Sequence, residues 1–120
     1  MKNLIFLSLL LFSSNSTFGQ TAKSLQSKPD AQKKILLVEA SCGECNFELP
    51  GKDCDLAVRI DGAAYFVDGV TIHDFGHPHD KNGFCVAVRK AEVQGEVSDG
   101  RFKASYFKLL PVEGDSPRKN

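Results

Sequence analysis

Four cysteines are the residues of this chain best suited to do chemistry. Cys42 and Cys45 form a C-x-x-C motif, eight residues separate Cys45 from Cys54, and thirty separate Cys54 from Cys85. Three uses fit this set: two structural disulfides, a tetrahedral metal site for Zn or Cu, or a catalytic dithiol. No thioredoxin-like strand–helix–strand pattern surrounds the motif, which counts against the dithiol. The spacing alone leaves the three uses open.

The three histidines of the chain lie within seven residues, at His73, His77 and His79. Neutral imidazole is a good ligand for Zn or Cu, and the His77–Pro78–His79 order can chelate one ion. Asp74 and Asp80 could add oxygen ligands or orient the imidazoles. A solvated polar loop explains the same residues equally simply. The histidines are therefore candidate additional metal ligands.

The chain carries no sequence motif of a common enzyme class. It has no G-x-S-x-G, no glycine-rich phosphate loop and no H-E-x-x-H. Its 15 Lys and Arg balance 15 Asp and Glu, so no net positive charge attracts it to nucleic acid. These observations favour a non-enzymatic binding or accessory module without a nucleic-acid partner. The alternatives are a metal-binding protein and a thiol oxidoreductase, and the sequence identifies no partner.

The first residues are typical of a secretory signal peptide. Lys2 is followed by an apolar run of nine residues, 4–12, and by small residues around Gly19. The run is too short to span a bilayer, which takes roughly 20 residues. We therefore expect residues 1–19 to be a signal peptide, cleaved near Gly19–Gln20, and the protein to be periplasmic or secreted. No later stretch of the mature chain has the length and apolarity of a membrane span.

The mature chain divides into a polar lead-in, a core and a polar tail. Residues 20–34 contain Pro29 and no apolar periodicity, so we expect a flexible lead-in. Residues 35–112 form the expected β domain, and residues 113–120 are a polar tail. A domain of this size buries little surface and often needs a covalent or metal staple. An oxidising destination would favour disulfides for that purpose.

Two Asp-Gly pairs predict two β-hairpins. Asp61-Gly62 lies between the apolar segments 56–60 and 63–67, and Asp99-Gly100 lies between 91–98 and 101–110. Glycine accepts the positive φ of a tight hairpin turn. In the first hairpin this register pairs Ile60 with Ala63 and Val58 with Tyr65.

The second hairpin alternates apolar and polar residues. The register pairs Val97 with Phe102, Gly95 with Ala104 and Val93 with Tyr106, which puts Val97 on the apolar face. Because glycine is a weak strand former, Gly95 marks a bulge or sharp bend in this strand.

The order of elements predicts an all-β fold with at most one short helix. A strand over 35–40 precedes the two hairpins, and 83–89 fits either a short helix or a strand. This order is that of a small five-stranded OB-like barrel; an open antiparallel sheet or a sandwich is the alternative. In the barrel, the loops that carry the cysteines and histidines meet at one rim.

Several longer segments also resemble one protein family. The segments VEASCGEC, CDLAVRIDG, AYFVDG, NGFC and RKAEVQGEVSDGRF, closing with FKLL, resemble a family of small exported bacterial domains of unknown function. The resemblance covers most of the mature chain. It implies that the four cysteines belong to the family pattern, and it implies no substrate.

Overall fold

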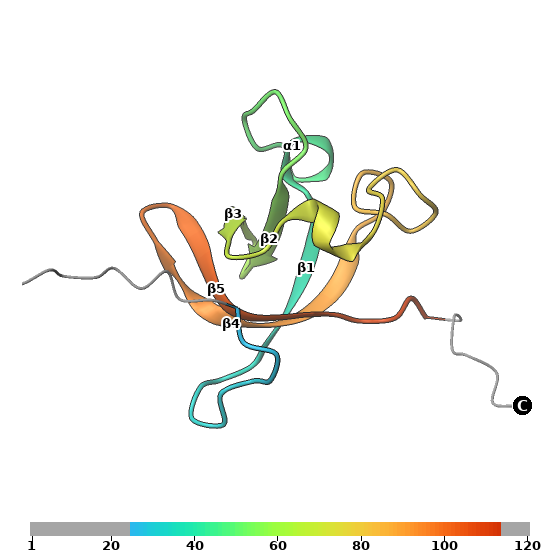
Figure 1. Cartoon of the computed structure of the whole chain (residues 1–120). Helices are drawn as coiled ribbons and strands as arrows, with labels where there is room; N and C mark the ends of the chain where they lie inside the picture. Colours follow the sequence, from blue (N-terminus) through green and yellow to red (C-terminus); the bar gives the residue numbers. More distant parts are fainter. Residues whose placement is uncertain (1–24, 114–120) are drawn as a thin grey trace, which may run out of the picture.

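The computed structural model describes residues 25–113 and contains five strands and two short helices (Figure 1). The elements in chain order are β1 (Leu36–Cys42), α1 (Gly43–Asn46), β2 (Leu56–Ile60), β3 (Ala63–Asp68), the 3₁₀ helix η1 (Ile72–Phe75), β4 (Arg89–Ser98) and β5 (Arg101–Leu109). The expected signal peptide, residues 1–19, lies outside the described residues. So does the larger part of the expected polar tail.

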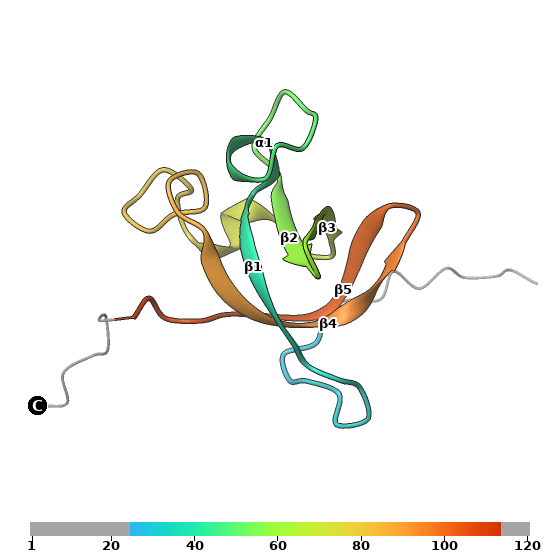
Figure 2. The same cartoon turned by 180° about the vertical axis from the view of Figure 1, so that it is seen from behind.

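The five strands close into a barrel in the order β1-β2-β3-β5-β4. All neighbouring strands are antiparallel except β3 and β5, which run parallel over two residue pairs, Val67 with Phe102 and Asp68 with Lys103. The prediction of a small five-stranded OB-like barrel is confirmed, and the open sheet and the sandwich are wrong. Seen from behind, β1 crosses the barrel between β2 and β4 (Figure 2).

Both Asp-Gly pairs form the predicted turns. Asp61 and Gly62 have φ values of 49° and 84°, and Asp99 and Gly100 have values of 54° and 71°. Two successive positive φ values are the signature of the type I′ turn, whose twist matches that of the flanking strands. The first hairpin has the predicted register, with Ile60 opposite Ala63 and Val58 opposite Tyr65.

The second hairpin has the predicted register only near its turn. Val97 pairs with Phe102 and Gly95 with Ala104, but a shift between Gln94 and Gly95 pairs Val93 with Phe107 instead of Tyr106. The shift is the β-bulge that Gly95 indicated: a Cβ on this residue would lie 2.2 Å from the carbonyl oxygen of Lys103. A side chain therefore cannot be accommodated there without moving the backbone.

Val97 is not buried, contrary to the sequence-based expectation. Its side chain is 46% exposed, although its partner Phe102 is 1% exposed. The pairing of β4 with β1 ends at Val93, so beyond this residue β4 is hydrogen-bonded to β5 alone. Val97 therefore lies on a strand with a free edge.

The short α-helix lies at another place than expected. Residues 84–86 form a turn, and the N–H groups of Val86 and Ala87 both donate to the carbonyl of Gly83. The N–H of Cys85 donates instead to Pro78 at 2.9 Å, so a regular helix cannot propagate through this position. Within residues 25–113, the one α-helical turn is α1, directly after β1.

The barrel interior holds one apolar cluster. Its members come from every strand and from the segment between β3 and β4: Val38, Ala40, Cys42, Leu56, Val58, Val67, Val70, Ile72, Phe84, Ala91, Val93, Phe102, Ala104 and Phe107. Within residues 25–113, no helix has the length and apolarity to cross a membrane.

The residues before β1 are fastened to the outside of the barrel. The side chain of Gln94, only 1% exposed, accepts from the N–H of Asp30 at 2.8 Å and donates to the carbonyls of Asp30 and Lys33, each at 2.9 Å. The N–H of Gln26 donates to Ser105 in β5. The part of the expected lead-in that the structure describes therefore packs against β4 and β5.

Candidate metal centre

Four thiols converge at one end of the barrel. Cys42 ends β1, Cys45 lies in α1, Cys54 precedes β2, and Cys85 lies in the turns before β4. Their Sγ atoms all lie within 4.8 Å of one another, and all four thiols are free. Four sulfurs at about 2.3 Å from one zinc ion would be about 3.8 Å apart. The quartet is thus one group with nearly the spacing of a tetrahedral thiolate site.

Helix α1 sets the positions of Cys42 and Cys45. Cys42 is its N-cap, and the Sγ atom of Cys42 accepts the N–H of Cys45 at 3.4 Å. Gly43 allows the helix to lie close to the barrel wall, because a Cβ there would come within 2.8 Å of the ring of Phe66 and 3.0 Å of Ala57. Close packing of α1 against β2 and β3 therefore explains why a glycine follows Cys42 in the motif.

Glu44 connects the motif to the loop that carries Cys54. Its Oε2 accepts the N–H of Asp55 at 2.9 Å and lies 3.6 Å from the Sγ of Cys42, whose thiol donates to it. Burial alone would raise the pKa of Glu44, but the hydrogen bonds from the N–H groups of Asp55 and of Glu44 itself hold it below its usual value. Glu44 is thus a carboxylate that fixes the loop beside the sulfurs.

One carbonyl oxygen brings Cys85 to the same place. The carbonyl of Phe84 accepts from the N–H of Cys42 at 3.0 Å, from the hydroxyl of Ser41 at 2.8 Å and from the side-chain amide of Asn46 at 3.0 Å. Asn46 also donates to the Ser41 hydroxyl at 2.7 Å. This cluster, called here the Phe84 carbonyl hub, joins the segment before β4 to β1 and α1.

Gly83 permits the tight path of the chain into Cys85. A Cβ at this residue would lie 2.3 Å from the carbonyl oxygen of Pro78 and 2.8 Å from that of His77. Only glycine, which has no side chain, allows these two loop segments to approach so closely. The approach lets Cys85 donate its N–H to Pro78, which orients the residue next to the other cysteines.

Burial keeps two of the thiols protonated. It raises the pKa of Cys42 to about 11, with an opposing contribution from the neighbouring Cys54 thiol. Burial also raises the pKa of Cys54, and the thiols of Cys42 and Cys85 raise it further. Four adjacent thiolates would repel one another in this environment without a cation. A divalent ion is the group that can displace the protons and hold the four sulfurs together.

The model of a protein family of unknown function, DUF6370, matches residues 36–110. The match covers more than half of the chain. The chain belongs to this family. No match was found among curated proteins or among solved structures.

The DUF6370 match contains the whole barrel from β1 to β5 and all four cysteines. The sequence resemblance to a family of unknown function is therefore confirmed. The family description names no activity and no compartment, so export stays a prediction.

The histidines lie beside the cysteine quartet but do not join it. His73, His77 and His79 line a cavity of about 660 Å³ that Cys54 also lines. The N–H of His79 donates to the Nδ1 of His77 at 3.2 Å. In residues 25–113, the four cysteines are the one set of three or more Cys, His, Asp or Glu donors close enough to share an ion.

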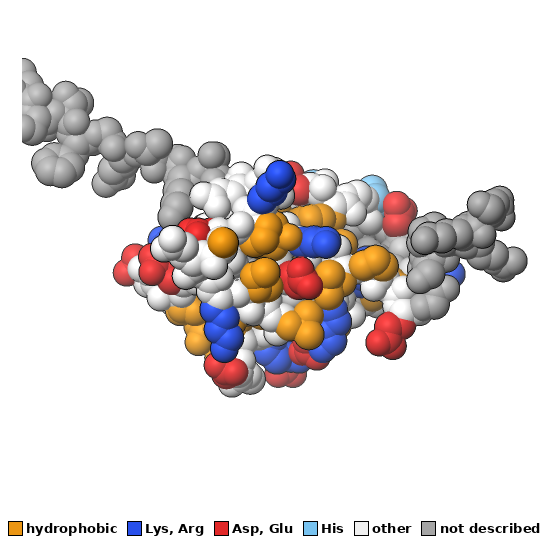
Figure 3. Space-filling model, turned by 90° about the horizontal axis from the view of Figure 1, so that it is seen from below, with side chains coloured by type: hydrophobic (Ala, Val, Ile, Leu, Met, Phe, Trp, Pro, Cys, Tyr) orange, Lys and Arg blue, Asp and Glu red, His pale blue; other side chains and the backbone are white. Residues whose placement is uncertain are grey.

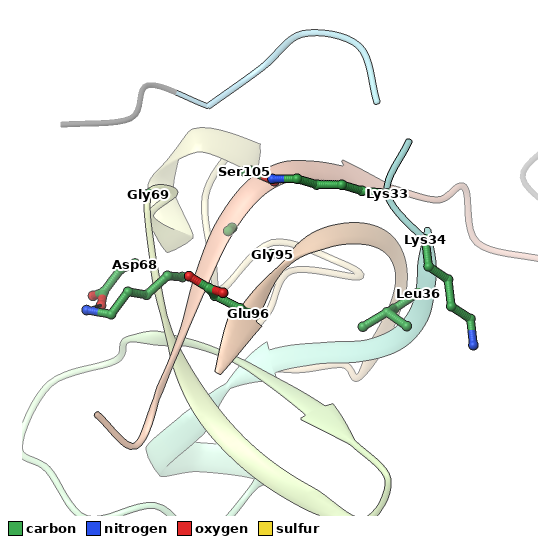
Figure 4. Close-up of a pocket in the computed structure, with 10 residues that line it drawn as sticks. Lys33, Lys34, Leu36, Asp68, Gly69, Gly95, Glu96 and Ser105 are labelled. Atoms are coloured by element: carbon green, nitrogen blue, oxygen red, sulfur yellow. Dashed lines mark ion pairs between the residues drawn. The ribbon is translucent and has the colours of Figure 1, made fainter. Parts of the chain in front are cut away.

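A second cavity lies elsewhere on the barrel. Its volume is about 630 Å³, and it is bordered by the β4–β5 hairpin, the end of β3 and the residues before β1. The acidic side chains of Asp68 and Glu96 lie on one side of it and Lys34 on the other (Figure 4). This cavity shares no lining residue with the cysteine quartet, and both signs of charge border it.

Sequence reasoning found the four cysteines but missed the residues that position them. Ser41, Glu44 and Asn46 are the missed residues, and all three lie in the segment ASCGECN. Their polar side chains directly beside the motif were the available signal. Their partners, Phe84 and Asp55, lie in other segments, which is why spacing alone could not reveal the contacts.

Proposed function

We propose that this protein is an exported, non-enzymatic module whose four cysteines hold one structural zinc ion. The observation that carries the proposal is the arrangement of four sulfurs, from three separate segments, within 4.8 Å of one another. Tetrahedral sites with four sulfur ligands are typical of Zn or Fe. Of these ions, we propose Zn²⁺, which has no redox chemistry and needs no further ligand.

The donor set supports a structural use of the ion over a catalytic one. Catalytic zinc keeps a coordination position for water or substrate, whereas four protein ligands fill a tetrahedral site. The Phe84 carbonyl hub and Glu44 orient the segments that supply the sulfurs, as hydrogen-bonded partners do around structural ions. The proposed ion stabilises the end of the barrel where α1 and the segment before β4 meet.

Zinc binding is tested on the reduced, metal-free mature domain. We expect native mass spectrometry to find one zinc per chain and Co²⁺ to give the absorption of a tetrahedral thiolate site. Free zinc at about one hundred times Kd stabilises the fold by about 2.7 kcal/mol, which raises Tm by about 10–20 °C in a domain of this size. Mg²⁺, which prefers oxygen ligands, should give no shift.

Two variants separate the cysteines from the histidines. Cys45→Ser should lose most of the zinc affinity, because one thiolate ligand is gone. The double variant His77→Ala, His79→Ala should still bind one zinc per chain, because neither histidine belongs to the close group of donors. A chain that binds no zinc, or that needs the two histidines to bind it, contradicts the proposal.

Export is tested separately, by expressing the full chain in a bacterial host and sequencing the N-terminus of the exported protein. The support is the apolar run of residues 4–12 and the small residues that follow it. We expect a mature N-terminus near Gln20. An intact Met1 on protein that stays in the cytoplasm contradicts this part of the proposal.

A further inference from the structure

The four thiols lie within 4.8 Å of one another but differ in exposure. Cys45 is exposed, Cys42 is buried, and Cys54 and Cys85 are half-buried. Cys42 and Cys45 lie on one helical turn, whereas Cys54 and Cys85 come from two other segments of the chain.

We propose that the quartet is a redox switch, in which oxidation by a small-molecule disulfide releases the ion and forms the bonds Cys42–Cys45 and Cys54–Cys85. The proposal rests on the proposed zinc site and adds its regulation. It assigns the cysteine connectivity, which four cysteines allow in three ways. Only this pairing joins the two cysteines that one helical turn holds together, and it leaves Cys54 and Cys85 to bond with each other.

Local geometry supports the first bond. Cys42 and Cys45 are three residues apart across the start of α1, and the N–H of Cys45 already donates to the sulfur of Cys42. The thiol of Cys45 is exposed, so a small disulfide can reach it first. Attack by Cys45 gives a mixed disulfide, which the adjacent sulfur of Cys42 then resolves.

The second bond joins the two segments that the ion joined. Cys54 precedes β2 and Cys85 precedes β4, so a bond between them ties the β1–β2 loop to the turns before β4. The Phe84 carbonyl hub also holds the turns before β4, by joining them to β1 and α1. The oxidised protein is therefore expected to keep the barrel while losing the ion.

The electrons and charges of the reaction balance. Four zinc-bound thiolates give up four electrons to form two cystine bonds. Two molecules of the small disulfide take up these electrons and leave as four thiolates. The zinc ion is released with its charge of +2, and no other oxidant or proton is needed.

Peptide mapping by trypsin distinguishes this pairing from both alternatives. Cleavage after Lys34, Lys52, Arg59, Lys81 and Arg89 places Cys42 and Cys45 together in 35–52, Cys54 in 53–59 and Cys85 in 82–89. The proposed pairing gives peptide 35–52 with an internal bond and a separate dimer of 53–59 with 82–89. Either alternative pairing links all three peptides into one species.

The experiment treats the zinc-loaded, reduced mature domain with oxidised glutathione and follows zinc release with a chromophoric chelator. We expect one zinc released for every two disulfides, the two-species peptide map and an unchanged circular dichroism spectrum. Cys45→Ser should prevent the first bond and still allow the dimer of 53–59 with 82–89. Cys85→Ser, the matched control, should allow the internal bond alone.

The outcomes separate this inference from the proposed function. A three-peptide species, or zinc that stays bound in excess oxidised glutathione, overturns the redox switch while the zinc site stands. Reduced protein that binds no zinc overturns the proposed function. In that case the redox switch is also wrong, even if the peptide map shows the proposed disulfide pairing, because there is no ion to release.

Discussion

Asn46 supports the proposed zinc site through hydrogen bonds and is not itself a ligand. Its side-chain amide donates both to the carbonyl of Phe84 and to the hydroxyl of Ser41, which fixes the segment that carries Cys85. A pattern of metal-ligating residue types in the sequence does not include residues with this role. They matter because a tetrahedral site needs all four sulfurs in position at once.

We expect Asn46→Ala to lower zinc affinity by about 10- to 100-fold, because loss of such a partner leaves the ligand less well oriented. The measurement is competition with a chromophoric chelator, and Gln32→Ala, at an exposed position before β1, is the control. An affinity equal to that of the wild type would show that the Phe84 carbonyl hub does not position Cys85.

The thiol of Cys42 makes the stability of the reduced, metal-free protein depend on pH. Its pKa in the folded protein is raised to about 11, above the value of about 8.5 of an unfolded cysteine. The folded state therefore holds the proton more tightly. The resulting stability is fully present below about pH 8.5 and is lost as the pH rises toward 11.

The check is the urea midpoint of the metal-free protein between about pH 7.5 and 10.5. We expect the midpoint of the wild type to fall more steeply with pH than that of Cys42→Ala, which lacks the titrating thiol. Parallel curves for the two proteins would contradict the burial of a protonated thiol at this position.

Among the elements, the β4–β5 hairpin has two paired positions of very unequal importance near its tip. Phe102 points into the barrel and is 1% exposed, whereas its cross-strand partner Val97 is 46% exposed. We expect Phe102→Ala to lower the free energy of unfolding by about 3–5 kcal/mol through the cavity it leaves. Val97→Asp should cost about 1 kcal/mol or less.

Urea denaturation of the two variants measures this difference, with the zinc-loaded wild type as reference. A large loss of stability in Val97→Asp would mean that another surface covers the hairpin tip in solution. A small loss in Phe102→Ala would mean that the barrel interior can close around the missing ring.

The hairpins were predictable because their information is local. Asp61-Gly62 and Asp99-Gly100 set each turn, and the alternation of the flanking residues set the register up to Gly95. Beyond the bulge the register moved by one residue, since a glycine marks a bulge without saying which strand gains the extra residue. The convergence of the cysteines followed from the order of the strands, whereas Ser41, Glu44 and Asn46 act through contacts between distant segments.

At the scale of the whole molecule, the surface carries both signs of charge. The face seen from below shows hydrophobic side chains among Lys, Arg, Asp and Glu (Figure 3), in keeping with equal numbers of acidic and basic residues. No field of one sign covers this face, so electrostatic attraction to a polyanion is not favoured there.

Gln94 fastens the segment before β1 to the barrel through three hydrogen bonds with Asp30 and Lys33. We expect Gln94→Leu to free this segment and to accelerate trypsin cleavage between Lys33 and Lys34, because backbone held by hydrogen bonds resists proteases. Mass spectrometry of a digestion time course measures the rate, with Gln32→Ala as control. An equal rate in wild type and variant would show that the side chain does not hold the segment.

The parallel contact between β3 and β5 closes the barrel with only two residue pairs. The β4–β5 ladder, by comparison, contains eight. A seam this short can open while the rest of the sheet stays intact, so its amide protons should exchange with deuterium through a local fluctuation of low free energy. Those hydrogen-bonded between β4 and β5 should exchange only on global unfolding. Because zinc at the proposed site would raise the free energy of global unfolding, it should slow exchange in the β4–β5 ladder more than at the seam. The two rates would then report separately on opening of the barrel and on its complete unfolding.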